Sequence, residues 1–423
     1  MSSNDVQPVP VNLPLSQRRL ISVFVLCMFS LNLAFFVRTR EGIKRGYPDF
    51  TIFYTAGTIL REGLGNHLYN LDVQYRVQQR FAGNIPFRRG PLPYNHPPFE
   101  APLFVPLTLL PYPQAFAVWD LANVVVLFGV AALLRRSVAL LHSIPPWKFV
   151  IGCIAFNPVF ACLFQGQDSI LMLLFCTLAF NALKKKSDVL GGCWLALAAF
   201  KFQFIVPLVL LLVIWRRRRV VLGFGAVVLL LAFISVMLVG MDSLLRYPGY
   251  VLQIARNPRL GGVPPQFLPN LHGLATGWTG PLAGAAGTAL AALVSIIAFV
   301  FAARKGLASA HLAKLELQFS LAIVVSGLVA WQTNSHDLSL LVLPLVLITD
   351  HCLHSTTQAL VKRFDLLLPV LPLLISPLWM VLWLAIAKVN LMAIPLLWWT
   401  WKIGRELSRG SGVAGYSVPA GAK

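Results

Sequence analysis

Residues 204–240 read FIVPLVLLLVIW-RRRR-VVLGFGAVVLLLAFISVMLVG, so that four consecutive arginines separate two apolar runs. The second run, 220–240, is long enough to cross a bilayer, which takes about 20 apolar residues in a helix. The first run, 204–215, is shorter and needs shielding by neighbouring helices. Because clustered arginine between two such helices marks a cytoplasmic loop, this stretch predicts a helical hairpin in a membrane.

The composition extends this prediction to the whole chain. Of 423 residues, 57% are apolar and 12% are charged, whereas a soluble domain carries about 25% charged residues. The formal net charge of +20 would be typical of a nucleic-acid-binding protein. Here, however, basic residues form short runs between apolar segments, as at Lys184–Lys186 and Arg304-Lys305. Such runs orient membrane helices, so we exclude nucleic acid as a partner and expect membrane lipid as the solvent.

Further apolar segments predict an all-α polytopic membrane protein with about 11–13 transmembrane helices. The first of them, Leu20–Val37, is expected to be a retained signal anchor, because no clear small-residue cleavage site is present. Phe99–Leu110 either crosses the membrane or re-enters it. The predicted spans are 20–37, 115–134, 149–165, 169–183, 204–215, 220–240, 280–302, 315–331, 338–350, 366–384 and 386–401.

Placing the basic runs inside gives an orientation for the chain, which we expect in the bacterial cytoplasmic membrane. The basic residues at 38–45 oppose this orientation, but the other loops agree with it. The expected organisation is a cytoplasmic polar tail (1–17), a single transmembrane domain (18–405) with extracytoplasmic loops at 38–98 and 241–278, and a cytoplasmic tail (406–423).

Polar residues gather at the expected outer ends of the helices. The chain has only 15 acidic residues, and a charged group at the centre of a membrane helix costs roughly 2.5–3.5 kcal/mol. Asp49, flanked by aromatics in Tyr47-Pro48-Asp49-Phe50, is therefore a candidate site residue. Apolar residues after it, from Phe53 to Leu64, follow helical spacing and predict an amphipathic helix in the membrane interface.

Several motifs, spread over most of the chain, together resemble glycosyltransferase family 87. Each fragment is weak alone, but the ordered set is fairly specific. The fragments are Asp49-Phe50-x-x-Phe53-Tyr54-x-Ala56-Gly57, Leu68-Tyr69-Asn70, Tyr94-x-His96-Pro97-Pro98, Pro106-Leu107-x-x-Leu110-Pro111, Trp119, Phe156-Asn157-Pro158, Gly166-Gln167-Asp168-Ser169, Lys201-x-Gln203, Pro269-Asn270-Leu271-x-Gly273-Leu274 and Ser335-His336-Asp337-Leu338.

This resemblance implies a GT-C-type bundle similar to polyprenyl-phosphate-mannose-dependent α-mannosyltransferases. It implies inverting, metal-independent transfer of mannose from a polyprenyl-phosphate donor to a glycan or glycolipid acceptor on the extracytoplasmic face, without a cofactor. It also implies that Asp49 is the catalytic base and that His336 belongs to the site. The chain departs from the family pattern at Asn95-His96, which bears on sugar and acceptor preference more than on reaction type.

The residue chemistry agrees with that expectation. An ionised aspartate such as Asp49 can take the proton of the acceptor hydroxyl. The leaving lipid phosphate needs cationic or hydrogen-bonding stabilisation, for which Lys201 is the first candidate and His336 the second. Gln203 and Asn270 are candidates for orienting sugar hydroxyls. Further candidates for sugar or acceptor binding are Gln167, His272, Tyr54 and His96.

Structural roles compete with these assignments. Asp49 can be a hydrated loop acid or a partner of Arg45 or Arg61, and Lys201 can be a lysine that extends from a helix end to water. His336 can simply begin a helix, with Asp337 stabilising the helix dipole.

Three of the remaining positions have similar alternatives. Asn270 and His272 can structure a loop rich in proline and glycine. Asp168 more readily caps the helix expected to begin at Ser169 than it contacts a substrate.

Two other function classes remain open. A transporter or flippase predicts repeated halves and charges near mid-membrane, neither of which the sequence contains. Another lipid-linked glycan transferase, such as a ligase or polymerase, predicts a large loop late in the chain with several arginines. The sequence has no nucleotide-binding motif or metal-ligand cluster, which argues against a nucleotide-sugar donor. It leaves the oligomeric state open.

Overall fold

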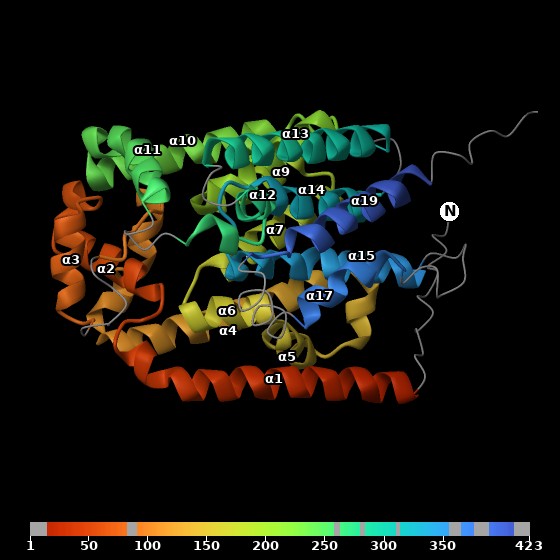
Figure 1. The fold of residues 1–423 in the computed structure, drawn as a ribbon, viewed down its shortest axis with the longest axis horizontal. Helices are drawn as coiled ribbons and strands as arrows, with labels where there is room; N and C mark the ends of the chain where they lie inside the picture. The colour runs from red at the N-terminus through yellow and green to blue at the C-terminus, as the bar shows by residue number, and fades with distance from the viewer. Residues whose placement is uncertain are drawn as a thin grey trace, which may run out of the picture.

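The computed structural model describes a bundle of helices aligned mainly along one axis (Figure 1). All regular elements in the described residues are helices, which confirms the predicted all-α polytopic class. The tails 1–14 and 410–423 and the second half of the predicted span 366–384, from residue 376 on, lie outside the described residues. The described ranges are 15–82, 91–257, 263–279, 284–309, 314–354, 365–375 and 389–409.

Five described helices are long and apolar enough to cross a membrane, or up to seven if each bent pair is one span. This number is below the expected 11–13, because some predicted spans are short or broken. The five are α1 (Leu15–Lys44), α4 (Tyr112–Arg135), α10 (Val220–Val239), α13 (Gly284–Ala308) and η9 (Ser335–Leu341) continued by α15 (Val342–His354). Shorter apolar segments are α7 (Ser169–Lys184), α14 (Leu315–Val329) and η10 (Asp365–Val370) with α17 (Leu371–Leu374). A last helix, α19, covers Ala393–Ser408.

Two spans bend sharply, and both bends carry polar residues. Helices α5 (Pro146–Ala155) and α6 (Asn157–Gln165) meet at 82°, and α8 (Asp188–Leu197) meets the segment of η5 (Ala199–Lys201) and α9 (Phe202–Ile214) at 68°. Asn157-Pro158 starts α6 in the geometry that proline favours at a helix start. Because the second bend ends at Lys201, it brings a lysine into the interior of the bundle.

Helices α8 and α10 are held close together by small residues. A side chain at Gly192 would collide with the backbone of α10, and one at Gly223 with the backbone of α8. Small residues of this kind allow membrane helices to approach closely. The contact fixes the first half of the bent span that leads to Lys201.

The first loop folds as a compact helical cap at one end of the bundle (Figure 1). It contains α2 (Phe50–Arg61), η1 (Gly65–His67) and α3 (Leu71–Gln79). The predicted amphipathic helix is present as α2, but residues 50–59 are buried within the protein and do not lie on the membrane surface. The reason is aromatic packing from the following segment, in which Phe104 stacks on Phe53 with ring centroids 4.5 Å apart.

The stretch 99–110, predicted to cross or re-enter, forms two 3₁₀-helices against α2. These are η2 (Pro98–Phe104) and η3 (Pro106–Leu109). At about 2 Å of rise per residue, neither can span a bilayer. The predicted loop 241–278 also holds helices, namely α11 (Met241–Arg256) and α12 (Leu271–Thr279), with a short η7 (Pro265–Phe267) between them.

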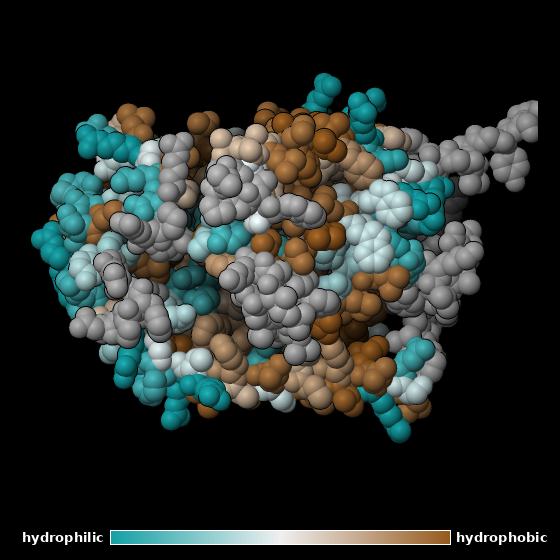
Figure 2. All heavy atoms as spheres, in the orientation of Figure 1, coloured by the Kyte–Doolittle hydropathy of each residue, from teal (hydrophilic) through white to brown (hydrophobic). Residues whose placement is uncertain are grey.

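On the face seen in Figure 2, hydrophobic residues gather over the middle of the bundle and hydrophilic residues at the α2–α3 end. Helix α1 lies at the edge of the bundle and exposes apolar side chains such as Leu20, Val23 and Leu26. It is joined to α5 by a hydrogen bond from Asn32 Nδ2 to Ile154 O (3.0 Å). Apolar exposure on this scale is explained by contact with lipid.

Candidate active site

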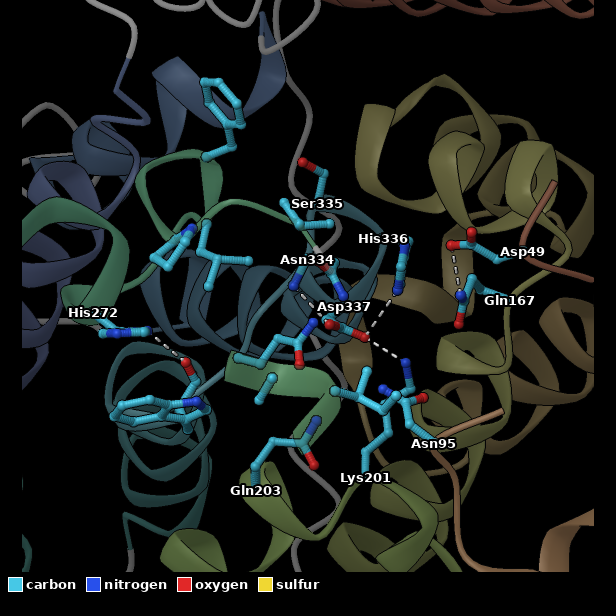
Figure 3. A pocket seen from close by; sticks show the side chains of 18 of the residues that line it. Asp49, Asn95, Gln167, Lys201, Gln203, His272, Asn334, Ser335, His336 and Asp337 are labelled. Carbon is cyan, nitrogen blue, oxygen red and sulfur yellow. Dashed lines mark hydrogen bonds and ion pairs between the residues drawn. The ribbon is translucent and has the colours of Figure 1, made fainter. Parts of the chain in front are cut away.

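A cavity of about 1350 Å³ lies between the first-loop cap and the bundle. Its walls come from segments that are far apart in the sequence. Asp49, Lys201 and His336 all line it, and Figure 3 shows them around one space. The cavity therefore brings together the residue predicted to be the base and the two predicted to bind the donor phosphate.

Asp49 precedes α2, but its carboxylate makes no side-chain cap to that helix. Instead, its Oδ2 accepts a hydrogen bond from Gln167 Nε2 (2.9 Å), while its backbone N–H donates to Gln165 Oε1 (3.1 Å). Within the described residues, neither Arg45 nor Arg61 forms an ion pair with Asp49, and Oδ1 accepts no protein hydrogen bond. The half-buried carboxylate thus presents one oxygen to the cavity.

The two glutamines that hold Asp49 come from the turn between α6 and α7. Gly166 has a φ of +61°, and a Cβ there would be 2.7 Å from Phe50 Cβ. Its carbonyl accepts a hydrogen bond from Trp119 Nε1 (2.9 Å). Glycine is required here for its backbone conformation and for space, and the tight turn places Gln165 and Gln167 on both sides of Asp49.

Lys201 is paired with two buried carboxylates. Its Nζ is 2.9 Å from Asp168 Oδ1 and 2.6 Å from Asp337 Oδ1, and its side chain is 5% exposed. Asp337 Oδ1 also accepts from Ser169 Oγ (2.9 Å). Because the ammonium is already matched by two negative charges, little of its charge is available to a substrate phosphate.

Asp168 does not cap α7 through its side chain, although it occupies the residue before that helix. Its carboxylate joins Lys201 on one side and His96 Nδ1 (3.2 Å) on the other. The predicted position of Asp168 at the start of α7 is confirmed, but its side chain makes no cap hydrogen bond. The Lys201 and His96 charges outweigh burial, which acts in the opposite direction, and hold the pKa of Asp168 far below its ordinary value.

His96 extends the ion-pair network into the first loop. Its Nδ1 is 2.8 Å from Glu100 Oε2, one helical turn further along the chain. Burial alone would lower the pKa of His96, but the carboxylates of Glu100 and Asp168 raise it to about 10. Burial raises the pKa of Glu100 to about 8, against the opposing charge of His96. At neutral pH, Glu100 is therefore protonated and His96 is charged.

The network is electrically balanced in that state. Asp168 and Asp337 carry negative charges, and Lys201 and His96 carry positive ones. One ligand atom each from His96, Glu100 and Asp168 lies within 4.8 Å of the others, a spacing that could hold a metal ion. A divalent cation there would face the Lys201 ammonium next to Asp168. We therefore interpret the cluster as an ion-pair network that fastens the first loop to the bundle.

Glu100→Gln is expected to weaken the pH dependence of stability. Because burial raises the folded-state pKa of Glu100 from 4.5 to about 8, its contribution is complete below about pH 4.5 and is lost as pH rises through about 8. The raised pKa of His96 adds a loss of the same sign between 6.5 and about 10. Thermal unfolding of the purified protein should show a steeper decline in wild type than in the variant between about pH 4.5 and about pH 8, the range set by the two pKa values of Glu100.

The matched control is Glu62→Gln, which removes a partly exposed acid of the same loop that pairs with Arg80. This control should keep the wild-type pH slope. Equal slopes in wild type and Glu100→Gln would contradict the raised pKa of Glu100.

His336 lies at the start of η9, with Nε2 3.5 Å from Asp337 Oδ1. Asp337 Oδ2 accepts a hydrogen bond from the backbone N–H of Asn334 (2.7 Å). The residue that stabilises the start of the helix is therefore Asp337, which also pairs with Lys201. His336 itself lines the cavity (Figure 3).

Two further predicted residues line the cavity, each in a different way. Gln203 makes no side-chain hydrogen bond within the described residues. The His272 ring stacks on Trp331 with centroids 4.1 Å apart, and its Nδ1 is 3.1 Å from Trp331 O. Burial lowers the pKa of His272, which favours a neutral ring.

Asn270 and Tyr54 do not line the cavity. The Asn270 side chain donates to Ala330 O (2.7 Å) and accepts from the Gly273 N–H (2.8 Å), so it orders the start of α12. The Tyr54 hydroxyl donates to Leu110 O (2.8 Å). Both polar groups are engaged in holding the fold.

The sequence interpretation assigned no ion-pair or cavity role to Glu100, Asp168, Asn95 or Trp331. A signal existed for Glu100, which is the acid within the apolar stretch 99–110 and follows His96 by four residues. For Asn95, the departure from the family pattern pointed to sugar or acceptor preference, but its place in the cavity wall depends on the tertiary fold. No comparable local signal marks Trp331.

The sequence model of glycosyltransferase family 87 matches residues 94–344, more than half of the chain. No curated protein and no solved structure matches the chain. The matched region includes His96, Lys201 and His336, whereas Asp49 precedes it.

Proposed function

The chain belongs to glycosyltransferase family 87, and we infer from this and from the cavity that it is an inverting enzyme using a polyprenyl-phosphate sugar. The transferred sugar is a hexose, mannose by family resemblance, and the acceptor is a glycan or glycolipid. The reaction takes place on the extracytoplasmic face of the bacterial cytoplasmic membrane. Membership of this family by itself indicates a membrane glycosyltransferase.

The observation that supports this function most is the state of the Asp49 carboxylate. One oxygen is held by Gln167, and the other faces a cavity large enough for a sugar with part of its lipid. A base positioned in this way does not depend on the surrounding ion pairs, because within the described residues it takes no part in them.

The reaction follows as a single displacement. Asp49 Oδ1 accepts the proton of the acceptor hydroxyl while the hydroxyl oxygen attacks the anomeric carbon. The bond between that carbon and the phosphate oxygen breaks, and its electron pair stays on the lipid phosphate. Because the nucleophile enters opposite the leaving group, the configuration at the anomeric carbon inverts.

His336 is the residue best placed to stabilise the charge on the donor phosphate. Lys201, the first candidate from the sequence, is neutralised by Asp168 and Asp337. His336 lines the cavity and is oriented by Asp337, so Lys201 acts on it through that carboxylate. Because Nε2 faces Asp337, the donor to the phosphate is the Nδ1–H of the charged ring, in which both nitrogens carry a proton. This N–H donates a hydrogen bond to the phosphate oxygen as charge develops there.

The lipid part of the donor needs an apolar groove. Helix α13 contributes Ala285, Ala289 and Ala292 to the cavity wall, and α11 contributes Leu252. These small side chains leave room between two helices at the edge of the bundle. We place the polyprenyl chain there, and the acceptor on the Asp49 side of the cavity.

The purified protein in lipid nanodiscs is expected to transfer labelled mannose from polyprenyl-phosphate-mannose to acceptor lipids. It should not use GDP-mannose when polyprenyl phosphate is absent. Transfer from GDP-mannose under that condition would overturn the lipid-linked donor. Transfer from neither donor, with a folded protein and a panel of acceptors and lipid-linked sugars, would overturn the proposed function.

A further inference from the structure

Three tyrosine hydroxyls fix the backbone of one turn beside the cavity. They come from α11, from the first loop and from the turn itself, and they donate to three consecutive carbonyl oxygens. The hydrogen bonds run from Tyr247 to Asn95 O (3.0 Å), from Tyr69 to His96 O (2.9 Å) and from Tyr94 to Pro97 O (3.0 Å).

The tyrosines themselves are immobilised by packing. The Tyr69 ring lies 5.0 Å from that of Tyr247 and stacks on Tyr94 at 6.4 Å between centroids. Gln74, which is fully buried, accepts a hydrogen bond from the Tyr94 N–H (2.9 Å). Since Pro97 also restricts the backbone, the turn has little freedom to adjust.

This rigidity determines where two neighbouring side chains lie. The His96 ring reaches the buried carboxylates of Glu100 and Asp168. The Asn95 side chain lines the cavity, and Figure 3 draws it among the polar groups there. Within the described residues, its amide has no hydrogen-bond partner.

We propose that the Asn95 amide binds two neighbouring hydroxyls of the transferred hexose and thereby selects among hexose epimers. The inference rests on the proposed function. An amide offers one acceptor oxygen and one NH₂ donor side by side, which matches a hydroxyl hydrogen and a hydroxyl oxygen on adjacent carbons. Inversion of either carbon moves one hydroxyl away from this pair.

The position that the reaction requires for the sugar in the cavity is compatible with its binding to Asn95. Its anomeric carbon must lie between the base, Asp49, and the residue proposed for the phosphate, His336. Both line the cavity whose wall contains Asn95. Because the turn is fixed from three sides, a sugar that does not match the amide cannot be accommodated by a backbone shift.

Asn95→Ala is the direct test. Relative kcat/KM is measured for polyprenyl-phosphate-linked mannose, glucose and galactose, in wild type and variant. The ratio between the best and the second-best donor should fall by about tenfold, as expected for the one hydrogen bond that an epimer loses and the polar group that it leaves unpaired. The loss should appear mainly as a higher KM for the preferred donor. Thermal stability should not change, because the amide has no partner within the described residues.

Tyr247→Phe tests the rigidity of the turn. It keeps the ring but removes the hydroxyl that binds Asn95 O, so the same ratio should fall by a smaller factor. The matched control is Tyr250→Phe, in the same aromatic cluster, whose hydroxyl accepts from Gln74 and does not reach the turn. This control should keep the wild-type ratio.

The outcomes separate this inference from the function on which it rests. If wild type transfers sugar and Asn95→Ala keeps the wild-type epimer ratio, the role of Asn95 is overturned and the function stands. If folded wild type transfers from none of the three donors, both are overturned. A reduced ratio in Asn95→Ala and Tyr247→Phe, with Tyr250→Phe unchanged, supports the inference.

Discussion

Asp49→Asn is expected to lower kcat for sugar transfer by about 10²–10⁴-fold, the usual contribution of a positioned base. The amide keeps the shape of the side chain but cannot take up the proton of the acceptor hydroxyl. Gln167 still finds an oxygen to bind, because an asparagine retains one acceptor. The variant should therefore fold, and donor binding should be nearly unchanged. Initial rates of transfer from polyprenyl-phosphate-mannose measure the effect.

The control for this variant is Asp72→Asn. Asp72 is an exposed acid in the first turn of α3, in the same loop as Asp49. It should retain wild-type activity. Activity that survives in Asp49→Asn would move the base to another residue of the cavity, of which His336 is the next candidate.

The sequence was sufficient to predict the fold class and the position of Asp49, because both signals are local. A long apolar run such as 220–239 forms a membrane helix wherever it is placed. Likewise, an acid beside aromatic residues in a chain so poor in acids is conspicuous on its own. The family motifs added order to these signals.

The ion-pair network could not be predicted in the same way. Its members His96, Asp168, Lys201 and Asp337 come from four separate segments, and their pairing exists only in the folded chain. A lysine at a helix end has the same local pattern whether it binds a phosphate or two carboxylates. For that reason the sequence favoured Lys201 as a phosphate ligand.

Asn270 shows the same ambiguity at a smaller scale. An asparagine before a helix serves equally well as a cap or as a sugar ligand. The structure distinguishes these roles, because both ends of the side chain are hydrogen-bonded to backbone groups.

The bends of 82° and 68° could not be predicted from the sequence either. The hydrophobic pattern shows where apolar residues occur but not the angle at which two short helices meet.

Lys201→Met is expected to destabilise the folded protein by about 3–5 kcal/mol, the usual cost of removing one partner of a buried ion pair. The variant leaves Asp168 and Asp337 buried within reach of each other's charge. Combining it with Asp337→Asn removes one of these negative charges and should recover part of the loss. Thermal and denaturant unfolding in detergent measure both variants.

Lys184→Met is the control for Lys201→Met, because it removes a lysine from an ion pair that is partly exposed. Lys184 pairs with Glu316 at 2.8 Å, but its side chain is 38% exposed, so its removal should cost no more than about 1 kcal/mol. If Lys201 also held the donor phosphate, Lys201→Met would in addition raise the KM for the donor, measured on the protein that remains folded. A large loss of stability that Asp337→Asn partly reverses can arise only if the two carboxylates depend on the lysine. In that case the lysine holds the ion-pair network of the site together, and His336 is the residue that we propose for the phosphate.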